Sequence, residues 1–310
     1  MAIKEPRIGW VKSRYGLGSM GLPMATNLQK HLLRTAQHSL TYYNRTIASG
    51  EPLQKLGANP ATNLPELVVK CDVALTMLAN DQVLTETIDS IVESSIGITN
   101  KVFVDSSTVH PDTTESVSRT ISGLGAIFLS APVFGSAAAD IRLYIQDVMG
   151  RKVIMCGEEA KNASLLKIGV NIITLNLMEA VGEAQVLAEQ TGLGTTAMEQ
   201  LITESFGGVA GGYSKRLTSG IWAPPLDTKP GFGVSLAIKD AKHASSLASD
   251  FKVSLPGLEI AHDNMLASRD YAGECLDSSS MYGALRVSAG VPFQNGTSRQ
   301  GYSVDLTPYV

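Results

Sequence analysis

Residues 16–28 read GLGSMGLPMATNL and begin shortly after the apolar run Ile8–Val11. A G-x-G-x-x-G pattern between an apolar run and a helical period is typical of a dinucleotide-binding turn. Gly16 permits a tight turn, Gly18 lets the backbone approach a pyrophosphate, and Gly21 lets the helix pack closely on the strand. The helix N-terminus then offers unpaired N–H groups to the phosphates. A flexible glycine loop is the alternative, and the surrounding sequence favours the cofactor turn.

The composition indicates a folded chain of one large domain or, as we favour, two packed domains. Its 310 residues are 44% hydrophobic and 17% charged, which is enough apolar material for either. The net charge is −4 and there is no basic run, so we expect no nucleic-acid partner. Cys71, Cys156 and Cys275 are far apart, and the five histidines lack metal-ligand spacing. Disulfides and a metal site are therefore not expected.

The sequence predicts neither a targeting segment nor a membrane span. The first residues run almost directly into the apolar run at Ile8, without room for the apolar region of a signal peptide. The most apolar later stretch, 165–181, carries Lys167, Asn171 and Glu179, so a buried helix fits better than a span. We expect a cytoplasmic protein with no membrane partner.

Strand and helix patterns alternate in the first half of the chain. Helical periodicity follows the glycine motif over Met20–Leu33. Apolar runs typical of buried parallel strands lie at Ile8–Val11, Ser39–Tyr43, Asp72–Leu78, Lys101–Asp105 and Ala126–Val133. This alternation predicts an α/β Rossmann-type parallel sheet.

From Lys161 onward the pattern becomes almost entirely helical. Residues 162–190 would form a helix of roughly 40 Å at 1.5 Å per residue, long enough to join two domains. Further helices are predicted over 195–206, 234–250, 256–268 and 279–289, with the glycine-rich run 207–212 as a flexible joint. The predicted architecture is a Rossmann domain over 1–160, followed by an all-α domain over 161–310.

The residues after the second predicted strand bear on the choice of dinucleotide. Asn44, Arg45 and Thr46 follow the glycine motif by roughly the twenty residues at which the ribose-reading residue is placed. An acidic residue there would bind the ribose 2′-hydroxyl of NAD, whereas a guanidinium beside a hydroxyl accommodates a 2′-phosphate. The sequence therefore predicts NADP(H) as the preferred cofactor, with NAD(H) possible. A solvent-exposed turn arginine is the alternative.

Polar residues follow two later strands. Asn80 comes after the strand at 72–78, and Ser107 and Thr108 come after the strand at 101–105. Ligands of doubly wound sheets bind outside the carboxyl ends of the strands. We therefore expect both loops to face the cofactor.

Five motifs in order give the chain a resemblance to the β-hydroxyacid dehydrogenase family. That family includes 3-hydroxyisobutyrate dehydrogenases, glyoxylate/succinic semialdehyde reductases and, more distantly, 6-phosphogluconate dehydrogenases. The motifs are GLGSMGLPMATNL at 16–28, DSSTVHP at 105–111, APVFG at 131–135, KIGVN at 167–171 and KD at 239–240. The resemblance covers nearly the whole chain.

The resemblance implies an oxidoreductase that interconverts a small 3-hydroxy acid and its semialdehyde or keto acid by hydride transfer. It implies that Ser107 and Gly135 hold a substrate carboxylate, that Lys167 is the general acid/base, and that Asn171 is its neighbour on the substrate. It also implies a helical substrate and dimerisation domain and a homodimer or higher homo-oligomer. The implied cofactor-binding residues are Gly16, Leu17, Gly18, Ser19, Met20, Gly21, Asn44, Arg45, Thr46, Leu78, Ala79, Asn80, Thr108 and Lys239.

Elementary chemistry supports the role of Lys167. Lys167 and Asn171 are four residues apart on one expected helix and so share a face. A lysine in an apolar helix costs desolvation energy unless it faces a cleft or a partner. Burial and a nearby oxidised nicotinamide would lower its pKa from about 10.4, so that it could donate or accept the proton of the hydroxyl group. The alternative is that Lys167 is a surface lysine without a catalytic role, whose aliphatic part packs on the helix while its amine reaches solvent.

Two other implied roles have structural alternatives. Ser107 follows a strand, where a serine often caps a helix. Lys239 and Asp240 are adjacent and point in different directions around a helix, so a surface salt bridge is the alternative for either residue. We assign a role to Lys239 only.

Two segments depart from the family pattern. Lys12–Tyr15 stands between the first strand and Gly16 as an insertion, and 136–142 is far shorter than the strand and helix that relatives have there. Loss of a buried strand would expose the edge of its neighbour. A faulty gene model would explain both departures. The competing functions are a non-catalytic dinucleotide-binding oligomer and an imine reductase-like enzyme, and the lysine at position 167 disfavours the second.

Overall fold

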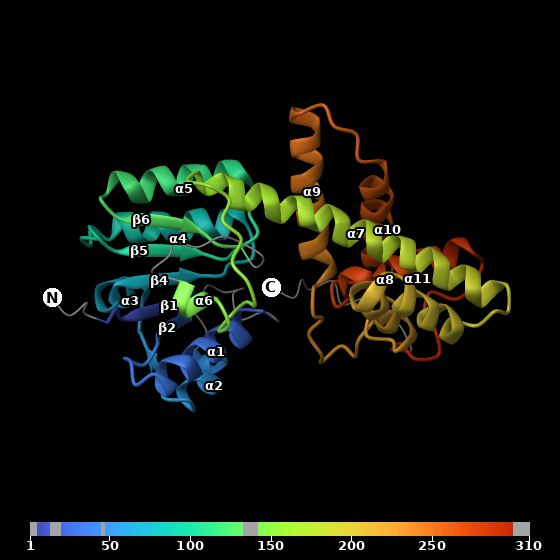
Figure 1. Ribbon diagram of the computed structural model, residues 1–310, viewed down its shortest axis with the longest axis horizontal. Coiled ribbons are helices and arrows are strands. Elements are labelled where there is room, and N and C mark those ends of the chain that lie inside the picture. The colour runs from blue at the N-terminus through green and yellow to red at the C-terminus, as the bar shows by residue number, and fades with distance from the viewer. Residues whose placement is uncertain (1–4, 13–19, 45–46, 133–141, 300–310) are drawn as a thin grey trace. The chain divides into compact units, whose positions relative to one another are not determined.

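The computed structural model describes residues 5–12, 20–44, 47–132 and 142–299. It divides into two compact units, Met1–Lys167 and Ile168–Val310 (Figure 1). The boundary falls inside one long helix, α7 (Ala160–Gln190), which therefore belongs to both units.

The first unit is built on a six-stranded parallel sheet. Its strands, in spatial order, are β3 (Asn59–Pro60), β2 (Thr41–Asn44), β1 (Ile8–Lys12), β4 (Val73–Thr76), β5 (Val102–Asp105) and β6 (Ile127–Ser130). The chain moves outward from β1 to β3, and then from β4 to β6 on the other side. Ligands of such sheets bind where this direction reverses, outside the carboxyl ends of β1 and β4. The prediction of a Rossmann-type sheet is confirmed.

Alternate side chains of the strands face two helical layers, because the side-chain period of a strand is two. Ile8 and Trp10 of β1 lie in one apolar core with α1 (Gly21–Arg34). Val11, on the opposite face, lies in a second core with α3, α4 and α5. Those three helices span Leu64–Lys70, Asp81–Glu93 and Pro111–Gly123, and the short elements η1, α2 and α6 span Ile47–Gly50, Glu51–Gln54 and Arg142–Ile145.

The second unit is helical. With most of α7 it contains α8 (Thr195–Thr218), α9 (Val234–Asp250), α10 (Pro256–Ala272), the 3₁₀ turn η3 (Ser278–Ser280) and α11 (Met281–Ser288). Their core surrounds Trp222, whose ring is fully buried and lies 5.5 Å from the Tyr282 ring and 5.3 Å from the Phe293 ring. A helical region after the sheet was predicted, and it is confirmed.

The predicted joint at 207–212 corresponds to a kink at Gly207, where the backbone leaves the helical conformation. The helix resumes directly afterwards, so the glycine-rich run is not a loop, and α8 continues to Thr218. Gly207 has a φ of 78°, in the region that favours glycine. A Cβ on Gly211 would lie 2.3 Å from Thr203 Oγ1, so only glycine permits this approach across the kink. The glycines therefore serve a kinked, closely packed helix.

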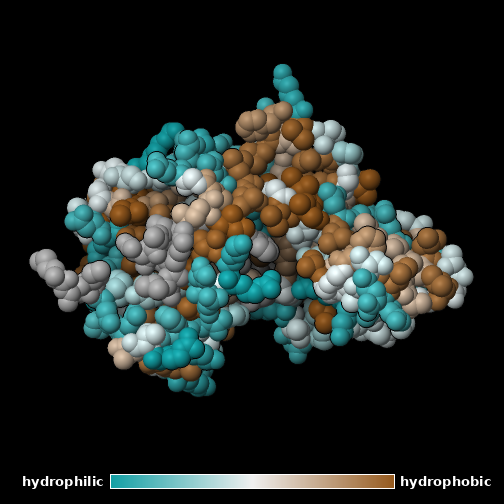
Figure 2. All heavy atoms as spheres, viewed as in Figure 1, coloured by the Kyte–Doolittle hydropathy of each residue, from teal (hydrophilic) through white to brown (hydrophobic). Residues whose placement is uncertain are grey.

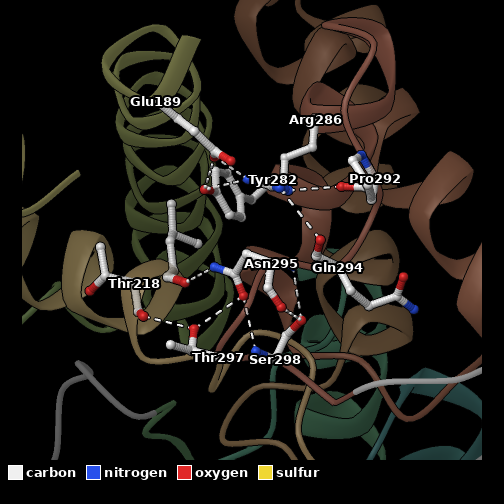
Figure 3. Close-up of polar contacts among 10 residues, drawn as sticks. Glu189, Thr218, Tyr282, Arg286, Pro292, Gln294, Asn295, Thr297 and Ser298 are labelled. Atoms are coloured by element: carbon white, nitrogen blue, oxygen red, sulfur yellow. Dashed lines mark hydrogen bonds and ion pairs between the residues drawn. The ribbon is translucent and has the colours of Figure 1, made fainter. Parts of the chain in front are cut away.

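A C-terminal segment, 292–298, ties the ends of three helices together (Figure 3). Arg286 of α11 forms an ion pair with Glu189 of α7, and its Nε donates a hydrogen bond of 2.9 Å to a carbonyl oxygen of the segment. The side chains of Asn295 and Thr297 donate to the last two carbonyl oxygens of α8, each at 2.8 Å. These bonds satisfy carbonyls that a helix end leaves without intrahelical partners.

α7 is long and apolar enough, by length and composition, to cross a membrane. In the second unit it contributes Ile168, Leu175, Met178, Val181 and Val186 to the hydrophobic core. It also buries polar side chains that bond to neighbouring helices of the same unit. We therefore interpret α7 as a core helix of the fold.

One of those buried polar groups makes stability depend on pH. Glu179 of α7 is 5% exposed, and its Oε1 accepts a hydrogen bond of 2.6 Å from Asn264 of α10. Burial raises the pKa of Glu179 from 4.5 to about 7, although the bond from Asn264 opposes the rise and the charge of Glu183 adds to it. Between pH 4.5 and 7 the folded state therefore holds a proton that the unfolded state has lost, and stability falls as pH rises.

We expect Glu179→Gln to remove this pH dependence. The amide stays neutral, so the variant should be more stable than the wild type at pH 8 by on the order of 2 kcal/mol, and close to it at pH 5. Thermal unfolding at pH 5, 6, 7 and 8 measures the difference. Glu204→Gln, an exposed change on α8, is the control. Parallel pH profiles for wild type and Glu179→Gln would show that Glu179 is ionised in the folded protein.

Candidate active site

The described part of the glycine motif opens α1. Gly21 begins the helix and Met20 precedes it, with no side-chain cap and no acidic residue in the first turn. The first N–H groups of α1 therefore suit an anion such as a pyrophosphate. Gly16, Leu17, Gly18 and Ser19 lie outside the described residues, so their predicted role is untested.

The end of β2 supplies the next predicted contact. β2 ends at Asn44, which is 6% exposed and pairs in register with Lys12 of β1. Asn44 therefore sits at the carboxyl edge of the sheet, beside the strand that leads into the glycine motif. Arg45 and Thr46 lie outside the described residues.

The loops after β4 and β5 are bonded to each other. The backbone N–H of Leu78 donates to Ser107 Oγ at 2.8 Å, and Ser107 Oγ donates to Asp105 Oδ1 at 2.6 Å. Ala79 and Thr108 lie beside these residues and are partly exposed. Asn80 caps α4 by accepting a bond of 2.9 Å from the N–H of Val83. Four predicted cofactor residues therefore gather around one bonded pair of loops.

Asp105 organises these loops and was missed in the sequence. It is 1% exposed and also accepts a bond of 2.6 Å from Thr76 Oγ1 at the end of β4. Burial raises the pKa of Asp105, and the bonds from Ser107 and Thr76 oppose that rise. An aspartate at the end of a predicted strand, followed by serines, could have suggested this role from the sequence. The hydrogen bond from Thr76, 29 residues earlier in the chain, could not have been predicted.

The structure revises the alternative role of Ser107. α5 begins at Pro111 with His110 as its N-cap, so Ser107 does not cap this helix. Ser107 is 2% exposed, and its hydroxyl proton is donated to Asp105. A substrate carboxylate held by this hydroxyl would have to replace that bond, and the substrate role remains a prediction. Gly135 lies outside the described residues.

The predicted acid/base and its neighbour lie one turn apart on α7. Lys167 is partly exposed, and Asn171 is 2% exposed. Asn171 Nδ2 donates a hydrogen bond of 2.6 Å to Asp240 Oδ2 of α9. Because Nδ2 carries this donor bond, the orientation of the amide is fixed.

The Asp240 carboxylate contacts the Lys239 side chain as well as the Asn171 amide. Lys239 Nζ lies 2.8 Å from Asp240 Oδ1, and the two side chains are 18% and 4% exposed. The salt bridge that was the alternative for this pair is therefore present, but it is largely buried rather than on the surface, and the cofactor role of Lys239 remains a prediction. Asp240 was passed over in the sequence, where its partner 69 residues away could not be seen.

A second buried carboxylate fixes the start of α9. Asp277 is fully buried, and its Oδ2 accepts a bond of 3.1 Å from the N–H of Phe232, just before the helix. Its Oδ1 pairs with Arg216 Nη1 at 2.7 Å. The backbone N–H of Val234 donates to the Leu276 carbonyl at 2.9 Å. The start of α9 is therefore bonded both to the Asp277 side chain and to the backbone just before Asp277.

Both halves of the chain match known protein families. Residues 8–145 match the NAD binding domain of 6-phosphogluconate dehydrogenase, and residues 162–285 match the family described as NAD-binding of NADP-dependent 3-hydroxyisobutyrate dehydrogenase. Both descriptions concern nicotinamide dinucleotides, which agrees with a helix, α1, that begins within the glycine motif.

Similar proteins span about nine-tenths of the chain. NADH-dependent oxidoreductase ucdB of Aspergillus ustus is 30% identical over 299 residues, covering 90% of this chain and 100% of that protein. Glyoxylate/succinic semialdehyde reductase 2, chloroplastic, of Arabidopsis thaliana is 29% identical over 291 residues, covering 88% and 78%. The structure of 3-hydroxyisobutyrate dehydrogenase of Mycobacterium tuberculosis has the same fold, with a TM-score of 0.71, 24% identity and coverage of 91% and 99%.

The buried Asp240 carboxylate should be measurable through stability. Asp240→Ala removes a partner of both Asn171 and Lys239 and should lower the free energy of unfolding by roughly 2–4 kcal/mol. Asp240→Asn keeps an acceptor for Asn171 and should cost less. Chemical denaturation checks both, with Asp250→Ala at the exposed end of α9 as the control. An Asp240→Ala variant as stable as the control would mean that this carboxylate is solvated.

Proposed function

The chain belongs to the β-hydroxyacid dehydrogenase family, and on that premise we propose that it interconverts a small 3-hydroxy acid and its semialdehyde or keto acid. It is a dehydrogenase or reductase that acts on CH–OH groups with a nicotinamide dinucleotide. The observation that carries the proposal is the pair Lys167 and Asn171, one turn apart on α7, with the Asn171 amide held by Asp240.

A nicotinamide dinucleotide held at the N-terminus of α1 and by the loops after β4 and β5 would supply or accept the hydride. In reduction Lys167 donates a proton to the carbonyl oxygen of the substrate, and in oxidation it removes the proton of the hydroxyl. Asn171 presents an amide whose rotation Asp240 has already fixed, so the substrate oxygen meets an oriented group. Lys239, paired with Asp240, adds a cation to this part of the site.

The substrate class follows from the chemistry of the predicted contacts. Ser107 and Gly135 are proposed to hold a carboxylate, by a hydroxyl and a backbone N–H respectively. The name of the Arabidopsis relative includes glyoxylate and succinic semialdehyde, two small aldehydes that carry a carboxylate. We therefore take short aldehyde acids as the substrates to test first.

The proposed cofactor is NADP(H), with NAD(H) as the competing choice. The proposal depends on Arg45 and Thr46 after Asn44, where an NAD-binding fingerprint has an acidic residue. The Aspergillus relative is named as NADH-dependent, so the preference for NADPH needs its own measurement.

We also propose that the chain forms a homodimer or a higher homo-oligomer. Large apolar side chains are exposed on its helical unit, where Figure 2 shows hydrophobic surface. Ile173 of α7, Phe206 and Val209 of α8 and Phe251 after α9 are 67–73% exposed. Exposed apolar surface of this kind is typical of association sites.

An assay of short aldehyde acids against both nucleotides tests the function. We expect turnover of succinic semialdehyde or glyoxylate with NADPH, and a lower KM for NADPH than for NADH because the 2′-phosphate meets Arg45. Arg45→Ser should weaken NADPH binding by roughly tenfold and leave NADH binding nearly unchanged, since it removes one charge-assisted contact. Binding of NADPH without reduction of any aldehyde acid would favour the non-catalytic alternative. A lower KM for NADH would overturn the cofactor assignment.

Lys167→Ala tests the acid/base. We expect kcat to fall by roughly 10²–10⁴, because proton transfer to the carbonyl oxygen is lost, while NADPH binding persists. Lys161→Ala is the matched control, because Lys161 lies on the same helix and forms part-exposed ion pairs with Glu159 and Glu115. Steady-state rates together with NADPH fluorescence titration separate chemistry from binding. A Lys167→Ala variant with an unchanged kcat would remove Lys167 from the mechanism.

A further inference from the structure

We propose that Ser164 is a positioning residue that sets Lys167 relative to the loops after β4 and β5. It acts through a buried cluster of three hydroxyl groups, those of Ser164, Thr114 and Ser130, which we call the hydroxyl cluster. The proposal rests on the function proposed above, because it assigns Ser164 a role through Lys167.

The hydroxyl cluster joins three elements of the first unit. Ser164 lies on α7, Thr114 on α5 and Ser130 at the end of β6, and they are 2%, 0% and 7% exposed. Thr114 Oγ1 and Ser164 Oγ are 2.7 Å apart, and Ser130 Oγ lies 3.5 Å from Ser164 Oγ. Two helices and a strand end are therefore linked through one buried serine oxygen.

The cluster continues into the loops that are predicted to line the cofactor. Thr114 Oγ1 also lies 3.3 Å from the carbonyl oxygen of His110, and the backbone N–H of His110 donates to Asp81 Oδ1 at 2.7 Å. Asp81 follows Asn80, and His110 follows Thr108 by two residues. Hydrogen bonds thus connect both loops with α7.

Ser164 and Lys167 are three positions apart on α7 and so lie on the same side of the helix. Apolar packing alone tolerates small rotations of a helix, because its contacts are not directional. A hydrogen bond of 2.7 Å between buried hydroxyls is directional, and it fixes the rotation of α7 at this turn. A proton donor displaced by about 1 Å can cost on the order of 10²-fold in rate.

The test separates a positioning role from a purely structural one. We expect Ser164→Ala and Thr114→Val to lower kcat by roughly 10- to 100-fold, with the KM for NADPH within about twofold of wild type, because the dinucleotide contacts are left in place. Thr114→Ser keeps the hydroxyl and should restore most of kcat. Ser130→Ala removes only the longer contact and should have a smaller effect, which gives a second variant if Ser164→Ala does not fold.

The matched control is Ser268→Ala in α10. Ser268 is also a fully buried helical serine, and its hydroxyl donates to the Ser280 carbonyl at 2.6 Å. It should lower the Tm while leaving kcat unchanged. Equal losses of Tm with an unchanged kcat in Ser164→Ala and Ser268→Ala would overturn the positioning role.

The Lys167→Ala variant distinguishes the two proposals. If it is inactive and Ser164→Ala keeps its full kcat, the proposed function stands and only the positioning role fails. If Lys167→Ala keeps its full kcat, the acid/base assignment fails and the positioning role fails with it. A loss of kcat in both variants, with rescue by Thr114→Ser, supports the positioning role.

Discussion

The hydrogen bond from Asn171 to Asp240 is the interaction on which the proposed chemistry depends. It joins α7 to α9 at a buried carboxylate that also meets the Lys239 ammonium. A buried carboxylate is costly without partners, so the arrangement persists only while both partners are in place. The same requirement orients the Asn171 amide one helical turn from Lys167.

In each of the two units, a buried carboxylate also links segments of that unit. Asp105 accepts bonds from Thr76 and Ser107 at the carboxyl edge of the sheet, and Asp277 accepts from Arg216 and from the backbone before α9. In each case one acidic side chain fixes two segments that are distant in sequence. A loop held this way loses less freedom when it meets a ligand, which favours binding.

Local patterns predicted the elements better than the contacts between them. The strand at Ile8–Val11 and the helices at 162–190 and 234–250 follow from apolar periodicity, which the sheet and helical layers confirm. At 207–212 the predicted break is present at Gly207, but the following glycines belong to a helix, and the sequence did not show that Gly211 packs closely against Thr203. Asp105 and Asp240 were missed because their partners lie 29 and 69 residues away.

The continuity of α7 explains why polar side chains on an otherwise apolar helix matter. Within a helix, backbone hydrogen bonds link each residue to the one four positions along, so a side chain fixed at one turn restricts its helical neighbours. Ser164 is bonded within the first unit, three positions before Lys167, and Asn171 is bonded within the second unit, four positions after it. An apolar residue at position 164 or 171 would keep the helix and its core, but it would remove the directional bonds on either side of Lys167.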